Sequence, residues 1–325
     1  MKSTVAVIYG GRSGEHEISI RSAKAIKEGL DRSKYDVVDY FIDLNGNWHP
    51  QPILPEPGVQ PEIDVVFPVL HGTFGEDGTV QGLLELADLP YVGAGVLASA
   101  VSMDKEMTKR VCRQRLLPVV DYVVVWRGCL ETGEACRRLS FPMFVKPANL
   151  GSSVGISRVG SREDLLPALA LAAEYDRKII VEQGIVGREF ECSVLGNEDP
   201  AASLPCEILP SREFYDYDDK YLLDRARTVV PADLPQAQTE EMRRLAVECF
   251  RAVECEGMAR VDFLLEAATN QLYINEINTI PGFTSISMYP KMWEASGIPF
   301  SELLDRLIEL ALRRHAVRKA TRYTR

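Results

Sequence analysis

The stretch YINEINTIPGFTSISMYP, residues 273–290, combines a predicted strand with an unusual set of polar side chains. Side chains alternate along a strand, so Glu276 and Asn278 share one face of this segment. The preceding strand, ARVDFLLEA at 259–267, places Arg260 and Asp262 on one face in the same way. A hairpin between the two strands would bring all four side chains together.

This predicted cluster has the composition of a magnesium site beside an anion. Two carboxylates and an amide oxygen are hard ligands, which suit magnesium held together with phosphate oxygens. Arg260 fits the same place if the metal carries an anionic group that a guanidinium can bind. The alternative interpretation is a buried arginine–carboxylate network that only orders the sheet.

Composition is typical of an ordinary soluble globular protein. The length of 325 residues exceeds one compact core and predicts two or three domains, while 46% apolar and 26% charged residues are average values. The net charge of -10 argues against general binding to nucleic acid or anionic membranes, and no apolar run approaches the length of about 20 residues that spans a bilayer. The seven cysteines, never spaced as CxxC, predict reduced thiols in the cytoplasm without structural zinc.

Strand and helix patterns predict an N-terminal part that differs from the rest. The predicted strands of this first part are 5–11, 37–42, 65–70 and 91–92, and its helices are 18–30 and 83–87. Strands that alternate with helices predict a parallel sheet covered on both faces.

After residues 98–109 the chain reads as strands joined by turns. The predicted strands are 144–147, 155–159, 179–182 and 189–195. A helix is predicted over 239–256, with Thr239 as its cap and Gly257 as its stop, and another over 301–312. We expect the basic tail after it, from Arg313 to Lys319, to be a solvated end.

Three further segments carry candidate nucleotide or substrate contacts. In FVKPANLGSSVGIS, 144–157, backbone N–H groups could wrap phosphate and Lys146 would supply charge, although a plain hairpin turn is the alternative. In IIVEQGIVGREFECSVL, 179–195, Glu182 and Glu189 could accept hydrogen bonds from a nucleotide and Ile185 could contact its base; singly, each glutamate is typical of a solvated turn. In GGRSGEHEIS, 10–19, local sequence favours Glu15 as a helix cap.

Eight motifs in order along the chain resemble those of one enzyme family. They are GGRSGEHEIS, VFPVLHGTFGEDGTVQGLLEL, VSMDKEMTK, FVKPANLGSSVGIS, VEQGIVGREFE, FYDYDDKY, ARVDF and NEINTIPGFTSISMYP. Over essentially its whole length the chain resembles the D-alanine:D-alanine ligases of the ATP-grasp superfamily. The resemblance implies a mixed α/β and α+β fold, with an N-terminal parallel α/β domain at 1–100 and α+β subdomains at 101–187 and 188–325 that clamp ATP.

The same resemblance implies a ligation reaction. The γ-phosphate of ATP would move to the carboxylate of one D-alanine, and the amine of a second D-alanine would displace phosphate to give D-alanyl-D-alanine for peptidoglycan and cell wall synthesis. Acyl phosphates hydrolyse readily, so the site must exclude water. The segment 211–228 is the expected lid, with an ordinary exposed loop as the alternative.

The implied cofactors are ATP and two magnesium ions, for which manganese can substitute. The implied partners are small-molecule substrates, D-alanine and ATP, without nucleic acid or membrane. A homodimer and a cytoplasmic location are also implied.

The resemblance assigns roles to matched residues. Glu15 would bind the ammonium of the first D-alanine in a hydrogen-bonded set with Ser152 and Tyr221, and Arg260 with the backbone N–H of Gly282 would stabilise the tetrahedral oxyanion. The expected substrate contacts are Glu15, His71, Arg260, Gly282, Ser287 and Met288. The expected nucleotide contacts are Lys105, Lys146, Ser152, Ser153, Glu182, Ile185, Glu189, Lys220, Asn275 and Glu276. The expected magnesium ligands are Asp262, Glu276 and Asn278.

Some implied roles have alternatives. His71 would position the first substrate or serve only the structure. Tyr221 and Met288 favour D-alanine as the second substrate over D-lactate or D-serine. The chain could instead be a non-catalytic nucleotide-binding regulator, against which the intact cluster around Arg260 argues, or a carboxylate–amine ligase for an L-amino acid or a peptide.

Overall fold

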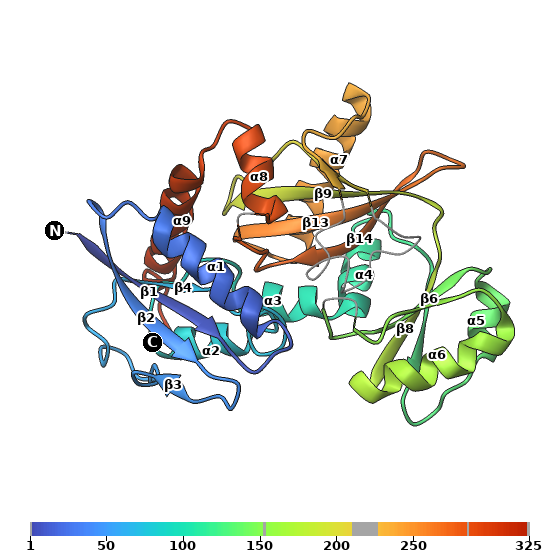
Figure 1. The fold of residues 1–325 in the computed structure, drawn as a ribbon, viewed down its shortest axis with the longest axis horizontal. Coiled ribbons are helices and arrows are strands. Elements are labelled where there is room, and N and C mark those ends of the chain that lie inside the picture. The colour runs from blue at the N-terminus through green and yellow to red at the C-terminus, as the bar shows by residue number, and fades with distance from the viewer. Residues whose placement is uncertain (1, 152–153, 210–226, 285, 324–325) are drawn as a thin grey trace.

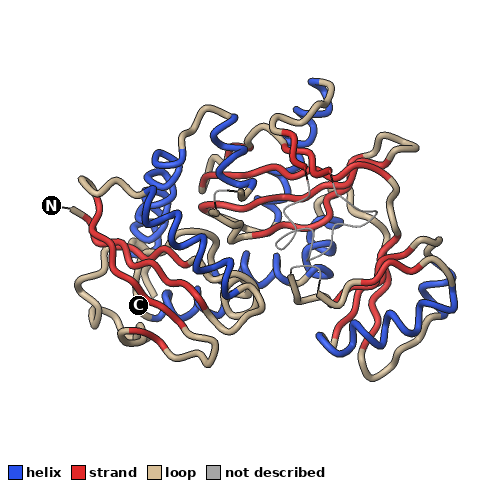
Figure 2. The backbone as a smooth tube through the Cα atoms, in the orientation of Figure 1, coloured by secondary structure: helices blue, strands red, loops and turns tan. Residues whose placement is uncertain are grey.

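In the computed structural model, the described residues form three β-sheets with helices packed around them (Figure 1). It describes residues 2–151, 154–209, 227–284 and 286–323. Both marked ends of the chain lie beside the first sheet, so the chain returns to its start after it has formed the other two (Figure 2).

The first sheet is the parallel unit that the N-terminal sequence predicts. Its strands are β1 (Ser3–Gly10), β2 (Tyr35–Ile42), β3 (Trp48–His49) and β4 (Val65–Pro68), in the order β3-β2-β1-β4. β1 runs parallel to both β2 and β4. Val5 and Val7 pack with α1 (His16–Gly29) and α9 (Phe300–Lys319), whereas Ala6 and Ile8 pack with α2 (Thr79–Leu86). Because both faces are covered, β1 is a continuous apolar run.

The second sheet is small and antiparallel. Its strands are β5 (Tyr122–Trp126), β6 (Met143–Pro147), β7 (Ser157–Val159) and β8 (Lys178–Gln183), in the order β5-β8-β6-β7. The helices α5 (Gly133–Arg138) and α6 (Arg162–Tyr175) share its hydrophobic core.

The third sheet is also antiparallel and contains the strands of the predicted polar cluster. Its strands are β9 (Gly187–Gly196), β10 (Ala201–Ala202), β11 (Cys206–Leu209), β12 (Arg227–Val229), β13 (Gly257–Glu266) and β14 (Leu272–Asn278). Their order is β12-β11-β9-β13-β14, with β10 on β9. Its helices are α3 (Val96–Met103), α4 (Lys105–Gln114), α7 (Gln236–Ala252) and α8 (Met288–Ala295). Residues of α3, α4 and α7 share one core with the sheet, and α8 contacts β9.

Three local expectations are wrong. The helix predicted over 239–256 begins at Gln236 after Pro235 and ends at Ala252, so Thr239 lies inside it, and Gly257, with φ +75°, opens β13. Proline supplies a fixed φ suited to the start of a helix, which outweighs the capping signal of the threonine. Residues 91–92 contribute a single bridge to the first sheet through Tyr91.

The basic tail is also not a simple solvated end. α9 continues seven residues beyond the expected end at Leu312, and Arg314 is buried. Its guanidinium donates to the carbonyl oxygens of Tyr91 and Gly93, which ties the C-terminal helix to the first sheet. Among the described residues, no helix has both the length and the apolar character needed to cross a membrane. The domain limits at residues 100 and 187 remain a prediction.

Candidate active site

The polar cluster predicted from residues 259–278 forms on two neighbouring antiparallel strands. Arg260 on β13 lies opposite Asn278 on β14, and Asp262 lies opposite Glu276. The Arg260 guanidinium donates to both carboxylate oxygens of Asp262, with Nε–Oδ1 at 2.6 Å and Nη2–Oδ2 at 2.7 Å. Its Nε also lies 3.4 Å from Oε2 of Glu191 on β9. The predicted juxtaposition of these side chains is therefore confirmed.

These contacts allow both interpretations of the cluster. Burial alone would lower the pKa of Arg260, but the carboxylates of Asp262 and Glu191 outweigh it and hold the pKa well above its usual range. An arginine–carboxylate network is thus present. The same strands offer the hard oxygen donors that magnesium prefers, from Asp262, Glu276 and Asn278. In the described part of the chain no three His, Cys, Asp or Glu side chains are placed to hold a metal, so such an ion would also need the Asn278 carboxamide.

A β-bulge in β14 connects this cluster to neighbouring lysines. The register shifts between Asp262 and Phe263 of β13, so Asn275 of β14 has no counterpart there. Its Oδ1 accepts from Nζ of Lys146 at 3.4 Å, and its carbonyl oxygen accepts from Nζ of Lys109 at 3.2 Å. Bulges redirect side chains next to functional sites. Here the extra residue brings a carboxamide toward the element that carries Lys146.

A buried glutamate near the end of β8 lies between two lysines. Oε1 of Glu182 is 2.9 Å from Nζ of Lys109, and Oε2 is 2.6 Å from Nζ of Lys146. Burial would raise the pKa of Glu182, but the two ammonium groups outweigh it and lower the pKa to about 2. Burial would likewise lower the pKa of Lys146, yet Glu182 raises it. Glu182 and Lys146 are therefore both charged at neutral pH.

Lys105 begins the helix that also carries Lys109. Its Nζ donates to the carbonyl oxygen of Leu150 at 2.7 Å and lies 3.8 Å from Oε2 of Glu276. Residues four apart share a helix face, so Lys105 and Lys109 point the same way. α4 thus presents two cations between the second sheet and the polar cluster on β13 and β14.

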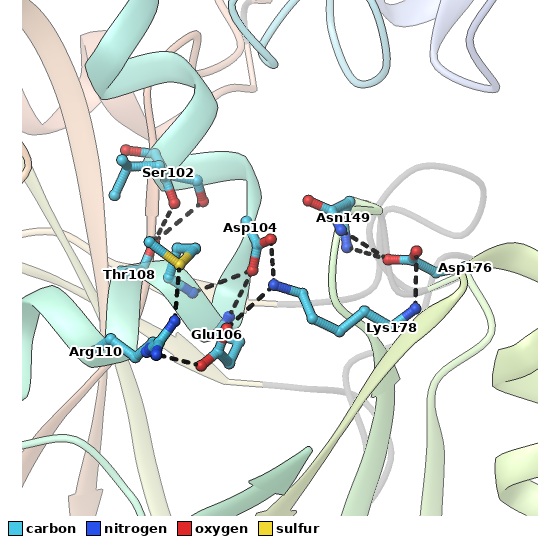
Figure 3. A network of polar contacts seen from close by, with 10 residues as sticks. Ser102, Asp104, Glu106, Thr108, Arg110, Asn149, Asp176 and Lys178 are labelled. Atoms are coloured by element: carbon cyan, nitrogen blue, oxygen red, sulfur yellow. Dashed lines mark hydrogen bonds and ion pairs between the residues drawn. The ribbon is translucent and has the colours of Figure 1, made fainter. Parts of the chain in front are cut away.

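A salt-bridge cluster joins α4 to the second sheet (Figure 3). Nζ of Lys178, at the start of β8, lies 2.5 Å from Oδ2 of Asp104 and 3.1 Å from Oε2 of Glu106. Asp104 also caps α4 by accepting from the backbone N–H groups of Glu106 and Met107. Asp176 accepts from the backbone and side chain of Asn149, which fixes the loop after Lys146 to the strand that carries Lys178.

Glu15 lies between two glycine-containing loops. It occupies the N-cap position of α1, but its side chain makes no capping hydrogen bond, so the capping interpretation is wrong. A Cβ on Gly72 would be 2.8 Å from Oε2 of Glu15, and a Cβ on Gly151 would be 3.6 Å from it. The carboxylate therefore lies beside both the loop after β4 and Gly151 in the middle of the predicted phosphate segment.

His71 connects the first sheet to the turn after β14. Its Nδ1 is 3.0 Å from the carbonyl oxygen of Ile280 and its Nε2 is 3.2 Å from Oγ of Ser22. A carbonyl only accepts, so Nδ1 carries the proton and the Ser22 hydroxyl donates to Nε2. Burial lowers the pKa of His71, although Glu15 acts in the opposite direction. A neutral imidazole with both nitrogens engaged favours a positioning role.

Glu76 is a buried carboxyl group in the same loop. Its Oε2 accepts from the backbone N–H of Gly72 at 2.6 Å. Burial and the nearby Glu15 raise the pKa of Glu76 to about 8. At neutral pH Glu76 is therefore mostly protonated.

The turn before α8 is closely packed around Gly282. A Cβ on this residue would be 2.7 Å from Oγ of Ser287, the N-cap residue of α8. That hydroxyl is fixed by the backbone N–H of Thr284 at 3.0 Å and by its hydroxyl at 2.8 Å. Glycine at this position permits the close approach of the Ser287 hydroxyl, which any larger residue would displace, and φ here is not positive.

A cavity of about 340 Å³ opens at the carboxyl ends of β1, β2 and β4. The strand order reverses at β1, and ligands of open α/β sheets bind at such an edge. Its lining includes Arg12, Trp48, His71 and Phe74, and the Arg12 guanidinium lies 4.3 Å from the centre of the Phe74 ring. The cavity shares His71 and Ser13 with the region around Glu15, which makes this edge a candidate substrate site.

Comparison with known proteins decides the family. A model described as the C-terminus of D-ala D-ala ligase matches residues 111–309, and one described as its N-terminus matches 4–58 and 54–94. A D-alanine–D-alanine ligase of Solibacter usitatus is 75% identical over 325 residues, covering 100% of both chains. The chain belongs to the D-alanine–D-alanine ligase family.

Solved structures agree with the assignment to the D-alanine–D-alanine ligase family. A ligase of this name from Coxiella burnetii has a TM-score of 0.88 and 42% identity, covering 98% of this chain and 96% of its own. The VanG D-Ala:D-Ser ligase from Enterococcus faecalis has a TM-score of 0.87 and 34% identity, covering 96% and 100%. The ATP-grasp fold expected from the sequence is therefore confirmed.

The family's expected site residues fall into three groups in this structure. The first group has direct contacts in the polar cluster on β13 and β14 or among the lysines around Glu182. It contains Lys105, Lys146, Glu182, Arg260, Asp262, Asn275, Glu276 and Asn278. Glu15, His71, Gly282 and Ser287 lie at the edge of the first sheet and the turn before α8, while Met288 begins α8. Ile185 lies between β8 and β9 and Glu189 lies within β9, and both residues are half-buried. Ser152, Ser153, Lys220 and Tyr221, with nearly all of the predicted lid, lie outside the described residues.

Four polar residues that contact this site were not identified from the sequence. They are Ser22, Glu76, Lys109 and Glu191. Lys109 follows Lys105 by four residues on a helix, and Glu191 lies in the strand that would pair with β13; these two spacings were the available signals. Ser22 and Glu76 act through contacts between distant segments, which local sequence does not reveal.

Proposed function

We propose that this chain joins two D-alanines to D-alanyl-D-alanine with ATP, for peptidoglycan precursor synthesis. The observation that carries the proposal is the pairing of Arg260 with Asn278 and of Asp262 with Glu276 on β13 and β14, in a chain that belongs to this family along its length. A cation beside oxygen donors suits a reaction in which negative charge develops on phosphate and then on a tetrahedral carbon.

The nucleotide would lie between the second and third sheets. Lys105, Lys146, Ser152 and Ser153 would contact phosphates, Lys220 would reach the γ-phosphate, and Glu182, Ile185, Glu189 and Asn275 would bind adenosine. The positions of Lys105, which is buried, and of Lys146, whose side chain is 12% exposed, support this assignment. When bound, magnesium ions on Asp262, Glu276 and Asn278 would neutralise phosphate charge, and manganese has the same preference for oxygen ligands.

The first D-alanine would bind with its ammonium at Glu15, helped by Ser152 and Tyr221. The carboxylate of Glu15 is well suited to this role because its Oε2 lies beside both Gly72 and Gly151. His71 would act through the turn at Ile280, not through the substrate. The carboxylate of this D-alanine accepts the phosphoryl group, and the lid would exclude water from the acyl phosphate.

The second D-alanine would bind at the turn before α8. Its carboxylate would be held by Ser287, whose hydroxyl is already oriented by Thr284, and by N–H groups of the helix start. Its neutral amine would attack the acyl carbon, and the oxyanion would be stabilised by Arg260 and the N–H of Gly282. Phosphate then leaves with the proton that the nitrogen loses, and the peptide bond is formed.

A D-alanyl-D-serine ligase is the second candidate, since one solved relative is named a D-Ala:D-Ser ligase. Phosphate release from ATP, measured with D-alanine, D-serine, D-lactate and L-alanine, separates the candidates. We expect that, of these four substrates, only D-alanine supports rapid phosphate release, and that mass spectrometry then detects the dipeptide. Absence of release with D-alanine would reject the proposal, and preference for a D-alanine and D-serine mixture would favour the second candidate.

We further propose that the enzyme works in the cytoplasm as a homodimer. All seven cysteines are free thiols, which agrees with a reducing compartment. On α3, Val96 and Leu97 are exposed beside Gly78 and offer an apolar surface for a second copy. Light scattering would give twice the mass of 36.3 kDa for a dimer, and a Leu97→Glu variant should shift it to the monomer.

A further inference from the structure

Lys109 has no role in the reaction as proposed, yet it is among the most completely buried cations of the described chain. Its side chain is 1% exposed, and its ammonium contacts Oε1 of Glu182 and the carbonyl oxygen of Asn275. Both partners belong to the expected nucleotide site. Charged side chains are rarely fully buried unless they are paired, and the pair of Lys109 is with a residue of the nucleotide site.

Two residues expected to bind different parts of ATP instead contact each other. Lys146 was assigned to the phosphates and Glu182 to adenosine, but Nζ of Lys146 lies 2.6 Å from Oε2 of Glu182. When phosphate draws Lys146 away, Glu182 would lose one of its two cations. A second cation must therefore remain beside Glu182, because a buried carboxylate without any cation is strongly disfavoured.

We propose that Lys109 is a positioning residue for the nucleotide, the fixed counter-ion of Glu182, whereas Lys146 is the exchangeable one that turns to phosphate when ATP binds. The inference rests on the proposed ATP-dependent function. It explains why one carboxylate has two cations before nucleotide binds. It also adds Lys109 to the residues that determine ATP affinity.

The contacts distinguish the two lysines. Lys109 has a second bond, to a backbone carbonyl of β14 at 3.2 Å, and it lies within α4 between that strand and β8. The side chain of Lys146 is 12% exposed, and its other partner is the Asn275 side chain at 3.4 Å. Lys146 also directly precedes the loop that leads to the expected phosphate contacts. Lys146 is therefore the lysine that can change partners.

Removal of Lys109 has two expected effects on nucleotide binding. Lys146 would become the only cation of Glu182 and would be held more strongly away from phosphate. If Glu182 accepts from the adenine amino group, as its proposed role in binding adenosine allows, its carboxylate would also lose the contact with Lys109 that fixes its direction. ATP affinity should fall for the first reason, and preference for adenine over guanine should fall for the second.

The test is calorimetric binding of magnesium ATP and magnesium GTP, without D-alanine, to the full chain. Lys109→Met should raise the Kd for ATP at least tenfold, while Lys109→Arg, which keeps the charge, should raise it less than threefold. Arg110→Met on the solvent side of the same helix, where the Arg110 side chain is 62% exposed, is the matched control and should bind ATP normally. In turnover, Lys109→Met should raise KM for ATP and change kcat less than threefold.

A charge-balanced double variant covers the case in which Lys109→Met fails to fold. The double variant Lys109→Met with Glu182→Gln removes one charge of each sign. Lys146 then no longer has the Glu182 carboxylate as a partner. The double variant should bind ATP more tightly than Lys109→Met, yet its preference for ATP over GTP should fall at least fivefold from wild type. An unchanged preference in this double variant would overturn the proposal.

The outcomes also separate this inference from the proposed function. If wild type binds ATP and Lys109→Met binds it within twofold of wild type, Lys109 is only structural and the inference fails. A lowered melting temperature with unchanged ATP affinity would have the same meaning. If wild type itself binds no ATP, the proposed function fails instead.

Discussion

Arg260 and Asp262, two residues apart on one face of β13, form a bidentate pair with both N–O distances below 2.8 Å. The same guanidinium is expected to stabilise an oxyanion, and the same carboxylate is expected to bind magnesium. Asp262 therefore fixes the direction of Arg260 in the free enzyme. Glu191 on the adjacent strand lies close enough to retain Arg260 when a metal engages Asp262.

Arg260→Ala should abolish turnover without loss of ATP binding. One oxyanion donor contributes about 3 kcal/mol to the transition state, so kcat should fall by about 10²–10³-fold. ATP affinity, measured by calorimetry, should change only a few-fold because the phosphates contact lysines. Arg260→Lys keeps the charge but not the bidentate geometry, so its kcat should lie between the kcat of wild type and that of Arg260→Ala. Normal dipeptide formation by Arg260→Ala would contradict the assignment.

Gly282→Ala should impair binding of the second substrate in particular. The added Cβ would lie 2.7 Å from Oγ of Ser287 and would displace a hydroxyl that is fixed by Thr284. We expect KM for the second D-alanine to rise at least tenfold in steady-state kinetics, with a nearly unchanged KM for ATP. Gly160→Ala, where no atom lies within 4 Å of the added Cβ, is the matched control. Equal kinetics for the two variants would refute the close contact.

The sequence predicts the polar cluster well because alternation and hairpin pairing are local rules. Arg260 and Asp262 had to share a face, and a short turn had to bring Glu276 beside them. The bulge at Asn275 could not be predicted, since it depends on how β14 fits β13. Residue alternation alone puts Asn275 on the face opposite Glu276, and only the family resemblance assigned it to the nucleotide.

Contacts between distant segments explain the other failures. Arg314 looked like part of a solvated basic end because no local pattern shows that Tyr91 and Gly93 present carbonyl oxygens to it. Glu76 was not identified because its burial depends on the packing of the loop after β4 near Glu15. Tertiary packing decided both positions, and the hydrophobic pattern does not encode it.

Glu76 should make stability depend on pH in an unusual direction. Its pKa is about 8 in the folded protein, whereas an unfolded glutamate titrates near 4.3. Between these values the folded state binds the additional proton, so this residue's contribution to the unfolding free energy decreases as pH rises. Relative to wild type, Glu76→Gln should gain about 3.5 kcal/mol between pH 5 and pH 8, at about 1.4 kcal/mol per pH unit over most of this range.

Denaturant unfolding of wild type and Glu76→Gln at several pH values tests this expectation, because other titrating groups cancel in the difference. Parallel stability profiles for the two proteins would show that Glu76 is ionised in the folded state. If the variant instead lost stability relative to wild type as the pH rises from 5 to 8, that result would also show that Glu76 is ionised in the folded state.

Lys178→Met should loosen the second sheet from α4 (Figure 3). The variant leaves Asp104 and Glu106, with side chains 15% and 12% exposed, without their shared ammonium. Loss of one partner from a largely buried pair costs about 3 kcal/mol. Lys24→Met is the control, because its pair with Glu28 is at 3.9 Å with both side chains about 70% exposed, so its loss should cost less than about 0.5 kcal/mol.

The site of the damage distinguishes this prediction from general destabilisation. Asn149 and the start of the phosphate segment are fixed through Asp176, two residues before Lys178. Amide hydrogen exchange should therefore increase in 104–109 and 146–151 of Lys178→Met, and remain at wild-type rates in β1 and β4 of the first sheet. An increase spread evenly over all three sheets would show that Lys178 has no specific role in holding α4 to β8.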